Sequence, residues 1–144
     1  MSLAVTKDNL QHLLESVPFT RDAGFLVHSL ADAECTLRVP YLDVFERPGG
    51  FIGGPILMAA ADVAMWFAIK TRLGFDDPAV TAEMKTNFLT PAAKEEFLCT
   101  AKVLRFGSRL IYGAAECKTA GGRLISHHTL TYIHPRAAGD ARPG

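Results

Sequence analysis

The feature of this 144-residue chain that most restricts its fold is an apolar stretch at residues 51–69, in which Asp62 is the only ionisable side chain. The sequence Gly-Gly-Pro at 53–55 opens the stretch, and Gly74 follows its end. Proline is favoured in the first turn of a helix and glycine just past its end, so the pattern predicts a helix. The stretch only reaches the lower limit for spanning a bilayer, and a carboxylate at mid-membrane is costly. We therefore expect a buried core helix and no contact with a membrane.

Period-two hydrophobic patterns, which are typical of strands with one buried face, follow this helix. They occupy residues 79–90, 95–106, 109–118 and 123–134, with separators short enough for antiparallel neighbours. Upstream, helical spacing at 3–17 ends at Pro18, a hairpin pattern covers 25–39, and a loop is expected at 40–50. The outline is a helix, two strands, a long apolar helix and four antiparallel strands.

A helix that is apolar on nearly its whole circumference cannot lie on a flat sheet with one side in water. A curved sheet can bury it, and the alanines at 60, 61, 64 and 68 would allow close approach to the strands. The sequence therefore predicts an α+β fold, an antiparallel sheet wrapped around one long central helix. The expected organisation is an N-terminal helix within 1–19, a single domain over 20–134, and a disordered tail, rich in Pro, Gly and Ala, over 135–144.

Composition excludes some classes of function. The 15 Lys and Arg residues balance 15 Asp and Glu residues, so the net charge is zero, whereas a nucleic-acid binder needs a basic face. A neutral chain with a positive mean hydropathy of +0.14 is poorly soluble as a monomer, which favours cover by a second copy. The three cysteines have neither a pairing pattern nor metal-ligand spacing, and the N-terminus lacks a signal-peptide pattern. We expect a cytoplasmic protein that holds no metal and no cofactor.

Asp62 is the strongest candidate for a functional residue. On a helical wheel it shares a face with Met58, Met65 and Trp66, and no position three, four or seven residues away carries a positive charge. A buried carboxylate without a partner is costly to keep charged, so such residues are often functional. The alternative is a structural aspartate that hydrogen-bonds to a neighbouring strand or subunit.

The helix start at 53–55 is the second candidate. A helix N-terminus presents N–H groups without intrahelical partners and a partial positive charge, which suit a polarised carbonyl oxygen. Glycine allows close approach, and because Pro55 has no N–H, the usable donors are those of Gly54 and Ile56. The alternative is an ordinary first turn of a helix.

Together, a carboxylate and a backbone donor are the minimum for cleaving an activated ester. A thioester suits so sparse a site, because its thiolate leaving group has a conjugate-acid pKa of about 8.5. Positions 54 and 62 lie about 12 Å apart along one straight helix, which is too far for both to act on one carbonyl. Gly54 and Asp62 can therefore cooperate only across two chains, so we expect at least a dimer.

Three segments carry a resemblance to a known family: RPGGFIGGPILMAAADVAMWFAI at 47–69, VTAEMKTNFLTPA at 80–92 and KVLRFGSRLIYGAAECK at 102–118. Over residues 20–134 the chain resembles the hot-dog-fold acyl-CoA thioesterases of the phenylacetate-degradation (PaaI-like) group. The resemblance implies a homodimer or a dimer of dimers, with Asp62 as base or nucleophile and the Gly54 amide as oxyanion donor across the interface. The segment that holds Asn87 often approaches the site in such relatives, so Asn87 is either a substrate contact or an ordinary polar residue of a strand. Many relatives have His-Gly-Gly where this chain has Gly-Gly-Pro at 53–55, and an Asn in the preceding loop where it has Arg47 and Pro48.

Other residues fit an acyl-CoA substrate. Arg105 and Arg109 flank a turn, where they would either bind the phosphates of coenzyme A or be solvated charges. Trp66 and Met58 suit either the wall of an acyl pocket or the core.

The first hypothesis is therefore a cytoplasmic acyl-CoA thioesterase, which releases a carboxylic acid and free coenzyme A. A second is an acyl-CoA-binding hot-dog protein without catalysis. A third, a hot-dog dehydratase or hydratase, requires a His paired with an acid at the helix, and no His lies between His28 and His127.

Overall fold

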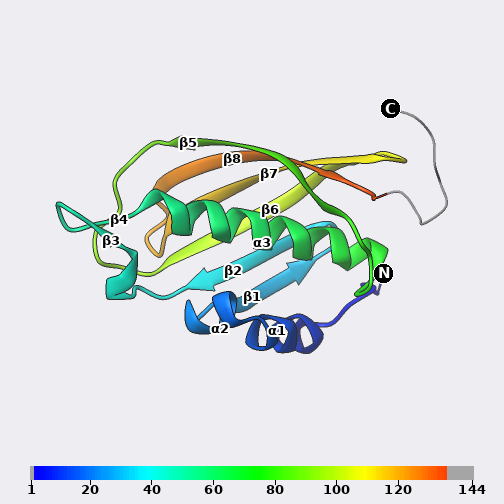
Figure 1. The fold of residues 1–144 in the computed structure, drawn as a ribbon, viewed down its shortest axis with the longest axis horizontal. Coiled ribbons are helices and arrows are strands. Elements are labelled where there is room, and N and C mark those ends of the chain that lie inside the picture. The colour runs from blue at the N-terminus through cyan, green and yellow to red at the C-terminus, as the bar shows by residue number, and fades with distance from the viewer. Residues whose placement is uncertain (1, 136–144) are drawn as a thin grey trace.

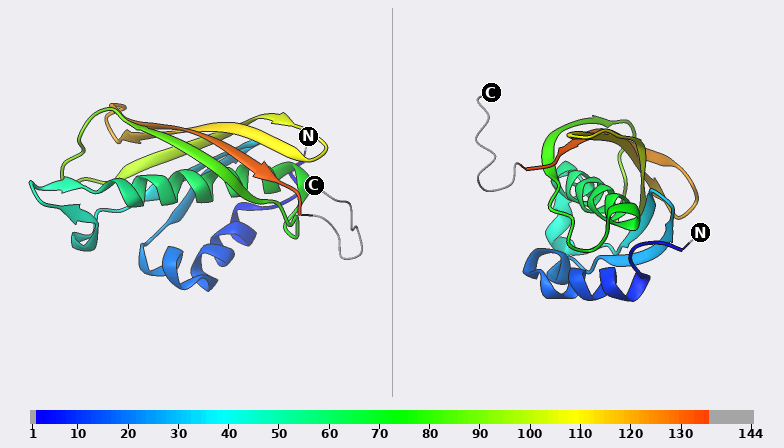
Figure 2. Two further views of the ribbon diagram at one scale, coloured as in Figure 1. Left: turned by 45° about the horizontal axis from the view of Figure 1, so that its top comes forward. Right: turned by 90° about the vertical axis from the view of Figure 1, so that its right-hand side faces the viewer.

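The apolar stretch forms helix α3 (Gly54–Leu73), and in the computed structural model an antiparallel sheet curls around it (Figure 1). The structure describes residues 2–135. The main sheet has six strands in the order β1-β2-β6-β7-β8-β5, and each neighbouring pair is antiparallel. These strands are β1 (Leu26–Ala31), β2 (Glu34–Val39), β5 (Val80–Phe88), β6 (Phe97–Phe106), β7 (Leu110–Thr119) and β8 (Leu124–Ile133). The end-on view in Figure 2 shows the sheet around the helix, which confirms the predicted α+β fold.

The packing of α3 against the sheet depends on small residues on both sides. The four alanines named above, Ala60, Ala61, Ala64 and Ala68, are all fully buried. On β7, a side chain at Gly113 would collide with Met65 of α3, so the glycine makes room for a large helix residue. Phe67 is also fully buried, and burying such a side chain stabilises the fold by about 1.5–3 kcal/mol. In residues 2–135, no helix is both long enough and apolar enough to cross a membrane.

Two predicted connections are wrong. The strand β5 does not pair with β6, because β2 and β7 already occupy both edges of β6; β5 instead pairs with β8 at the edge of the sheet. The predicted loop at 40–50 contains a 3-10 turn and most of a short hairpin, in which Gly49 and Gly50 have positive φ angles of 106° and 82°. These elements are η1 (Asp43–Phe45), β3 (Glu46–Arg47) and β4 (Phe51–Ile52).

The N-terminal segment forms two helices, α1 (Lys7–Ser16) and α2 (Pro18–Asp22), where one was expected. Pro18 follows the end of α1, as predicted, but it also begins α2, because proline is well tolerated at a first helical position. The helix α1 packs beside β1, where the Gln11 side-chain oxygen accepts a hydrogen bond from the Val27 N–H at 2.8 Å. The predicted tail lies outside the described residues except for residue 135.

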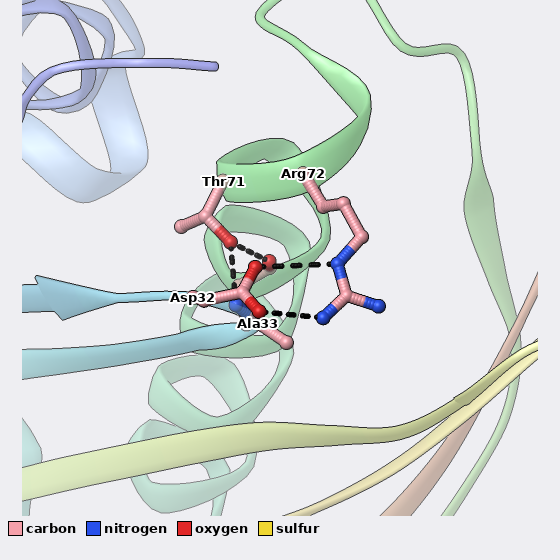
Figure 3. Close-up of polar contacts among 5 residues, drawn as sticks. Asp32, Ala33, Thr71 and Arg72 are labelled. Atoms are coloured by element: carbon pink, nitrogen blue, oxygen red, sulfur yellow. Dashed lines mark hydrogen bonds and ion pairs between the residues drawn. The ribbon is translucent and has the colours of Figure 1, made fainter. Parts of the chain in front are cut away.

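The C-terminal end of α3 is tied to the turn between β1 and β2 (Figure 3). The Arg72 guanidinium forms two hydrogen bonds to the Asp32 carboxylate, at 2.6 and 3.2 Å. Ala33, which has a positive φ of 60°, donates its N–H to the Thr71 hydroxyl at 2.9 Å. This end of the helix is therefore anchored by side chains of its own chain.

Candidate active site

Asp62 lies in the middle of α3, half-buried, on the side of the helix that the sheet leaves open. Its Oδ1 accepts hydrogen bonds from the hydroxyls of Thr81 on β5, at 2.6 Å, and Tyr132 on β8, at 2.8 Å. The expectation that Asp62 is buried without a partner is therefore wrong. A helical wheel shows only residues of the same helix, whereas both donors come from strands.

A cavity of about 390 Å³ opens beside Asp62, between α3 and β5. It is lined by Asp62, Val63, Trp66, Asp77, Pro78, Ala79, Val80, Thr81 and Tyr132. Trp66 thus forms part of a cavity wall next to the carboxylate. The arrangement places an acid, two hydroxyls and an aromatic ring around one space.

The loop at 74–79, part of which lines this cavity, is held in place by Lys70. This buried side chain donates hydrogen bonds from Nζ to the carbonyl oxygens of Phe75 and Asp77, the second at 3.4 Å, and lies 4.9 Å from the centre of the Trp66 ring. Burial lowers the pKa of Lys70, because it removes water from the ammonium group. The Asp77 carboxylate accepts a hydrogen bond from the Ala79 N–H at 3.1 Å, which fixes the entry of the chain into β5.

Gly54 is the first residue of α3, so its N–H has no carbonyl partner within the helix. The preceding residue, Gly53, is extended, with φ −72° and ψ 151°, and no side chain caps the helix. A Cβ at Gly54 would lie 2.8 Å from Cζ of Phe88, so the glycine lets that ring approach the helix start. A second cavity, of about 400 Å³, begins here and is lined largely by apolar side chains, including Leu57 and Ile125.

Within one chain, the structure does not bring Gly54 and Asp62 together. They border different cavities, at the start and in the middle of α3, as their separation along the helix predicts. Any site that uses both groups must combine two chains.

The remaining predicted residues lie elsewhere on the surface. Met58 is 38% exposed, one turn before Asp62 on the open side of α3. Asn87 is exposed on β5, between two residues that point inwards: Thr86 bonds to a buried histidine, and Phe88 covers Gly54. Since strand side chains alternate, Asn87 faces away from the helix.

The two arginines lie at the far end of the sheet. Arg105 and Arg109 are exposed beside the turn between β6 and β7, at the opposite end of the fold from the start of α3 (Figure 1). Neither lines the two cavities described here.

Sequence reasoning missed Thr81 and Tyr132. They are direct neighbours in the antiparallel register of β5 and β8, so their hydroxyls reach the same carboxylate oxygen. Burial, together with the charge of Asp62, raises the pKa of Tyr132, so this hydroxyl stays protonated. Only the pairing of β5 with β8 identifies them, because Thr81 and Tyr132 are 51 positions apart in the sequence, which is farther than a local sequence pattern extends.

The strand histidine His128 has a structural environment. It is fully buried, and its ring nitrogens lie 2.8 Å from the hydroxyls of Thr86 and Ser126. The hydrogen bonds of the His128 ring are therefore satisfied within the fold. In residues 2–135, no group of three or more His, Cys, Asp or Glu side chains is arranged to hold a metal ion.

Comparisons with known proteins identify the family. The model of the thioesterase superfamily matches residues 49–140. A protein of Saccharolobus solfataricus, provisionally named an esterase, is 39% identical over 98 residues, which are 68% of this chain and 69% of that protein.

Solved structures agree with this match. One of a provisionally named thioesterase from a Silicibacter species is 30% identical, with a TM-score of 0.83, over 94% of this chain and 96% of that one. A Haemophilus influenzae thioesterase, only 17% identical, has a TM-score of 0.82 over 92% of this chain and 94% of that one, which shows the shared fold. The chain belongs to the thioesterase superfamily, a family of thioester hydrolases, and its sheet around a central helix is the hot-dog fold.

Proposed function

We propose that the protein hydrolyses acyl-CoA thioesters to a carboxylic acid and free coenzyme A, with Asp62 as general base or nucleophile. The observation that carries the proposal is the Asp62 carboxylate, which borders a cavity and is oriented by two hydroxyls at Oδ1. No hydrogen bond from residues 2–135 is found at Oδ2, so this oxygen is available to a water molecule or to the thioester carbon.

The chemistry needs few groups. A positioned general base contributes about 100- to 10,000-fold to the rate, and a backbone oxyanion donor about 100- to 1,000-fold. The Gly54 N–H is the proposed donor, because it is unpaired within the helix and lies at the positive end of the helix dipole. The thiolate leaves without a strong acid, so no third catalytic group is required.

The proposed active unit is a homodimer that pairs through β5. This strand forms an open edge of the sheet, and its apolar residues Val80 and Phe88 are 51% and 56% exposed. An open apolar edge is a template for pairing with another strand. A second copy on β5 would extend the sheet and cover these side chains.

The register of such a pair would complete the site. If two β5 strands run antiparallel about a two-fold axis near Met84 and Lys85, Thr81 of one copy lies opposite Phe88 of the other. Thr81 binds Asp62, and Phe88 covers Gly54. This pairing would therefore place the carboxylate of one copy near the helix start of the other. It supports the dimer as the smallest active form, and a dimer of dimers would use the same pairing.

The same two-fold arrangement suggests where coenzyme A binds. Arg47 borders the cavity at Gly54, and also a larger one of about 670 Å³ between α2 and the start of α3. Antiparallel pairing would carry Arg105 and Arg109 of the second copy towards this end of the first. We assign the phosphates of coenzyme A to these cations, which bind phosphate through charge-assisted hydrogen bonds. Trp66 and Met58 are the proposed contacts of the acyl group, and Asn87 is the least supported site residue because it faces outwards.

The test is the release of free thiol from a panel of acyl-CoAs. We expect turnover by the wild type and a loss of at least about 100-fold in Asp62→Asn, since the amide cannot act as a base. Asp76→Asn, a change of the same type at an exposed position close by in the chain, should retain activity. Turnover that survives in Asp62→Asn would overturn the assigned role.

Two alternative functions predict other outcomes. An acyl-CoA-binding protein would bind acyl-CoA tightly, without turnover by the wild type. A hydratase needs a His beside the acid, and the buried His128 instead bonds to Thr86 and Ser126.

A further inference from the structure

Tyr132 is a buried residue whose hydroxyl contacts Asp62, and packing of the aromatic ring alone would not require this contact. The side chain is only 3% exposed, and its hydroxyl lies 2.8 Å from Asp62 Oδ1 and 2.8 Å from the Asp62 carbonyl oxygen. It comes from β8, a strand with neighbours on both sides, whereas the other donor, Thr81, is exposed on the open edge strand beside a register shift. Tyr132 is therefore the better fixed of the two donors.

A single phenolic proton must serve two acceptors. The Asp62 carbonyl oxygen belongs to the interior of α3, where it already accepts an intrahelical hydrogen bond. An ionised carboxylate is a stronger acceptor than a backbone carbonyl, since charge-assisted hydrogen bonds are roughly twice as strong as neutral ones. The proton is thus directed to Oδ1.

We propose that Tyr132 is a positioning residue, which fixes the orientation of the Asp62 carboxylate and leaves Oδ2 as the reacting oxygen. This inference rests on the proposed function of Asp62. With Oδ1 held by two hydroxyls, the carboxylate cannot rotate without breaking both bonds. The other oxygen, Oδ2, therefore has a fixed orientation towards the substrate or its attacking water.

Few other charged groups face this carboxylate. Asp77, in the loop before β5, lines the same cavity, and His134, just after β8, lies 3.7 Å from Asp77. Lys70 on α3 lies behind Trp66 and binds the loop carbonyls. Within residues 2–135 the Tyr132 hydroxyl forms hydrogen bonds only to Asp62, so Tyr132→Phe removes hydrogen bonds to this residue alone.

The experiment compares Tyr132→Phe with Tyr112→Phe, which removes a hydroxyl from a 42% exposed tyrosine on β7. In Tyr132→Phe we expect kcat to fall about 10-fold, since one hydrogen bond to a charged group is lost. We expect KM to change little, because the Tyr132 hydroxyl is bonded to Asp62 and the aromatic ring is retained in Tyr132→Phe. Tyr112→Phe should match the wild type in both.

Two further outcomes separate the explanations. In the Asp62→Asn background, Tyr132→Phe should cause no further loss of kcat, because the group that it positions is gone. If Tyr132→Phe lowers the Tm but leaves kcat of the folded protein unchanged, Tyr132 is only structural and the inference is wrong. If Asp62→Asn is itself fully active, the proposed role of Asp62 fails, whatever the Tyr132 variant does.

Discussion

The two edge strands of the main sheet, β1 and β5, differ in how far the rest of the chain covers them. At β1, the helix α1 packs alongside, and Gln11 takes up the free N–H of Val27. At β5, the strand is exposed for most of its length, and Phe88 is half-exposed. Open edges promote uncontrolled pairing unless they are covered or used. The chain covers one edge and leaves open the edge beside which the proposed base, Asp62, lies.

The largest expected effect comes from placing a charge on the open edge. Val80→Glu, on β5, should weaken the proposed dimer by about 100-fold or more, because an unpaired charge in an interface costs several kcal/mol. Activity should fall with it, since the site would no longer be completed. Sedimentation velocity and thiol release over a range of protein concentrations measure both.

Leu26→Glu is the matched control at the covered edge. Leu26 on β1 is 46% exposed, compared with 51% for Val80 on β5. This variant should keep the oligomeric state and the activity of the wild type. A dimer that survives Val80→Glu unchanged would show that the open edge is not the interface.

An intermediate effect, on stability, is expected when β1 at the covered edge loses its hydrogen bond to Gln11. Gln11→Ala should lower the free energy of unfolding by about 1–3 kcal/mol, because the Val27 N–H would lose its acceptor. Gln11→Glu keeps a side-chain oxygen at the same place and should recover most of the loss. Urea unfolding measures both, and activity at low denaturant should not change. Equal stability of Gln11→Ala and the wild type would show that the contact does not protect this edge.

The smallest effect is expected at the turn next to the covered edge. The hydrogen bond from Arg72 lowers the pKa of Asp32 below its ordinary value of 3.8. A lowered pKa contributes stability above the unfolded value, and this contribution is lost as the pH falls through the folded value. Arg72→Gln should therefore be slightly less stable than the wild type at pH 7, and the two should converge below about pH 3.8. A difference that persists at pH 2 would assign the effect to packing.

Most of the fold could be predicted from local patterns. The apolar helix and the period-two strands follow from which side chains must be buried, and these patterns lie within short windows. The order of the strands could not be predicted in the same way. Placing β5 beside β8 depends on the fact that β2 and β7 occupy both edges of β6, which involves contacts between distant segments.

The site was predictable only where one residue stood out by its type. Asp62 is conspicuous in an apolar helix, and Gly54 is conspicuous as an uncapped helix start. Thr81 and Tyr132 are ordinary strand residues until the register sets them side by side. Arg105 and Arg109 could be assigned to a turn, but their distance from the helix start depends on the three-dimensional path of β6 and β7.

A mixing experiment tests whether Asp62 of one copy acts together with Gly54 of another. Asp62→Asn and Gly54→Pro, which removes the N–H, should each be nearly inactive. Gly54→Ala puts a Cβ against the same Phe88 ring but keeps the N–H, so its activity controls for steric effects. In an equal mixture that exchanges at random, half of the dimers are mixed and each has one intact site, so about a quarter of wild-type activity should return. No return of activity, with exchange of folded subunits verified by mass spectrometry, would contradict the account.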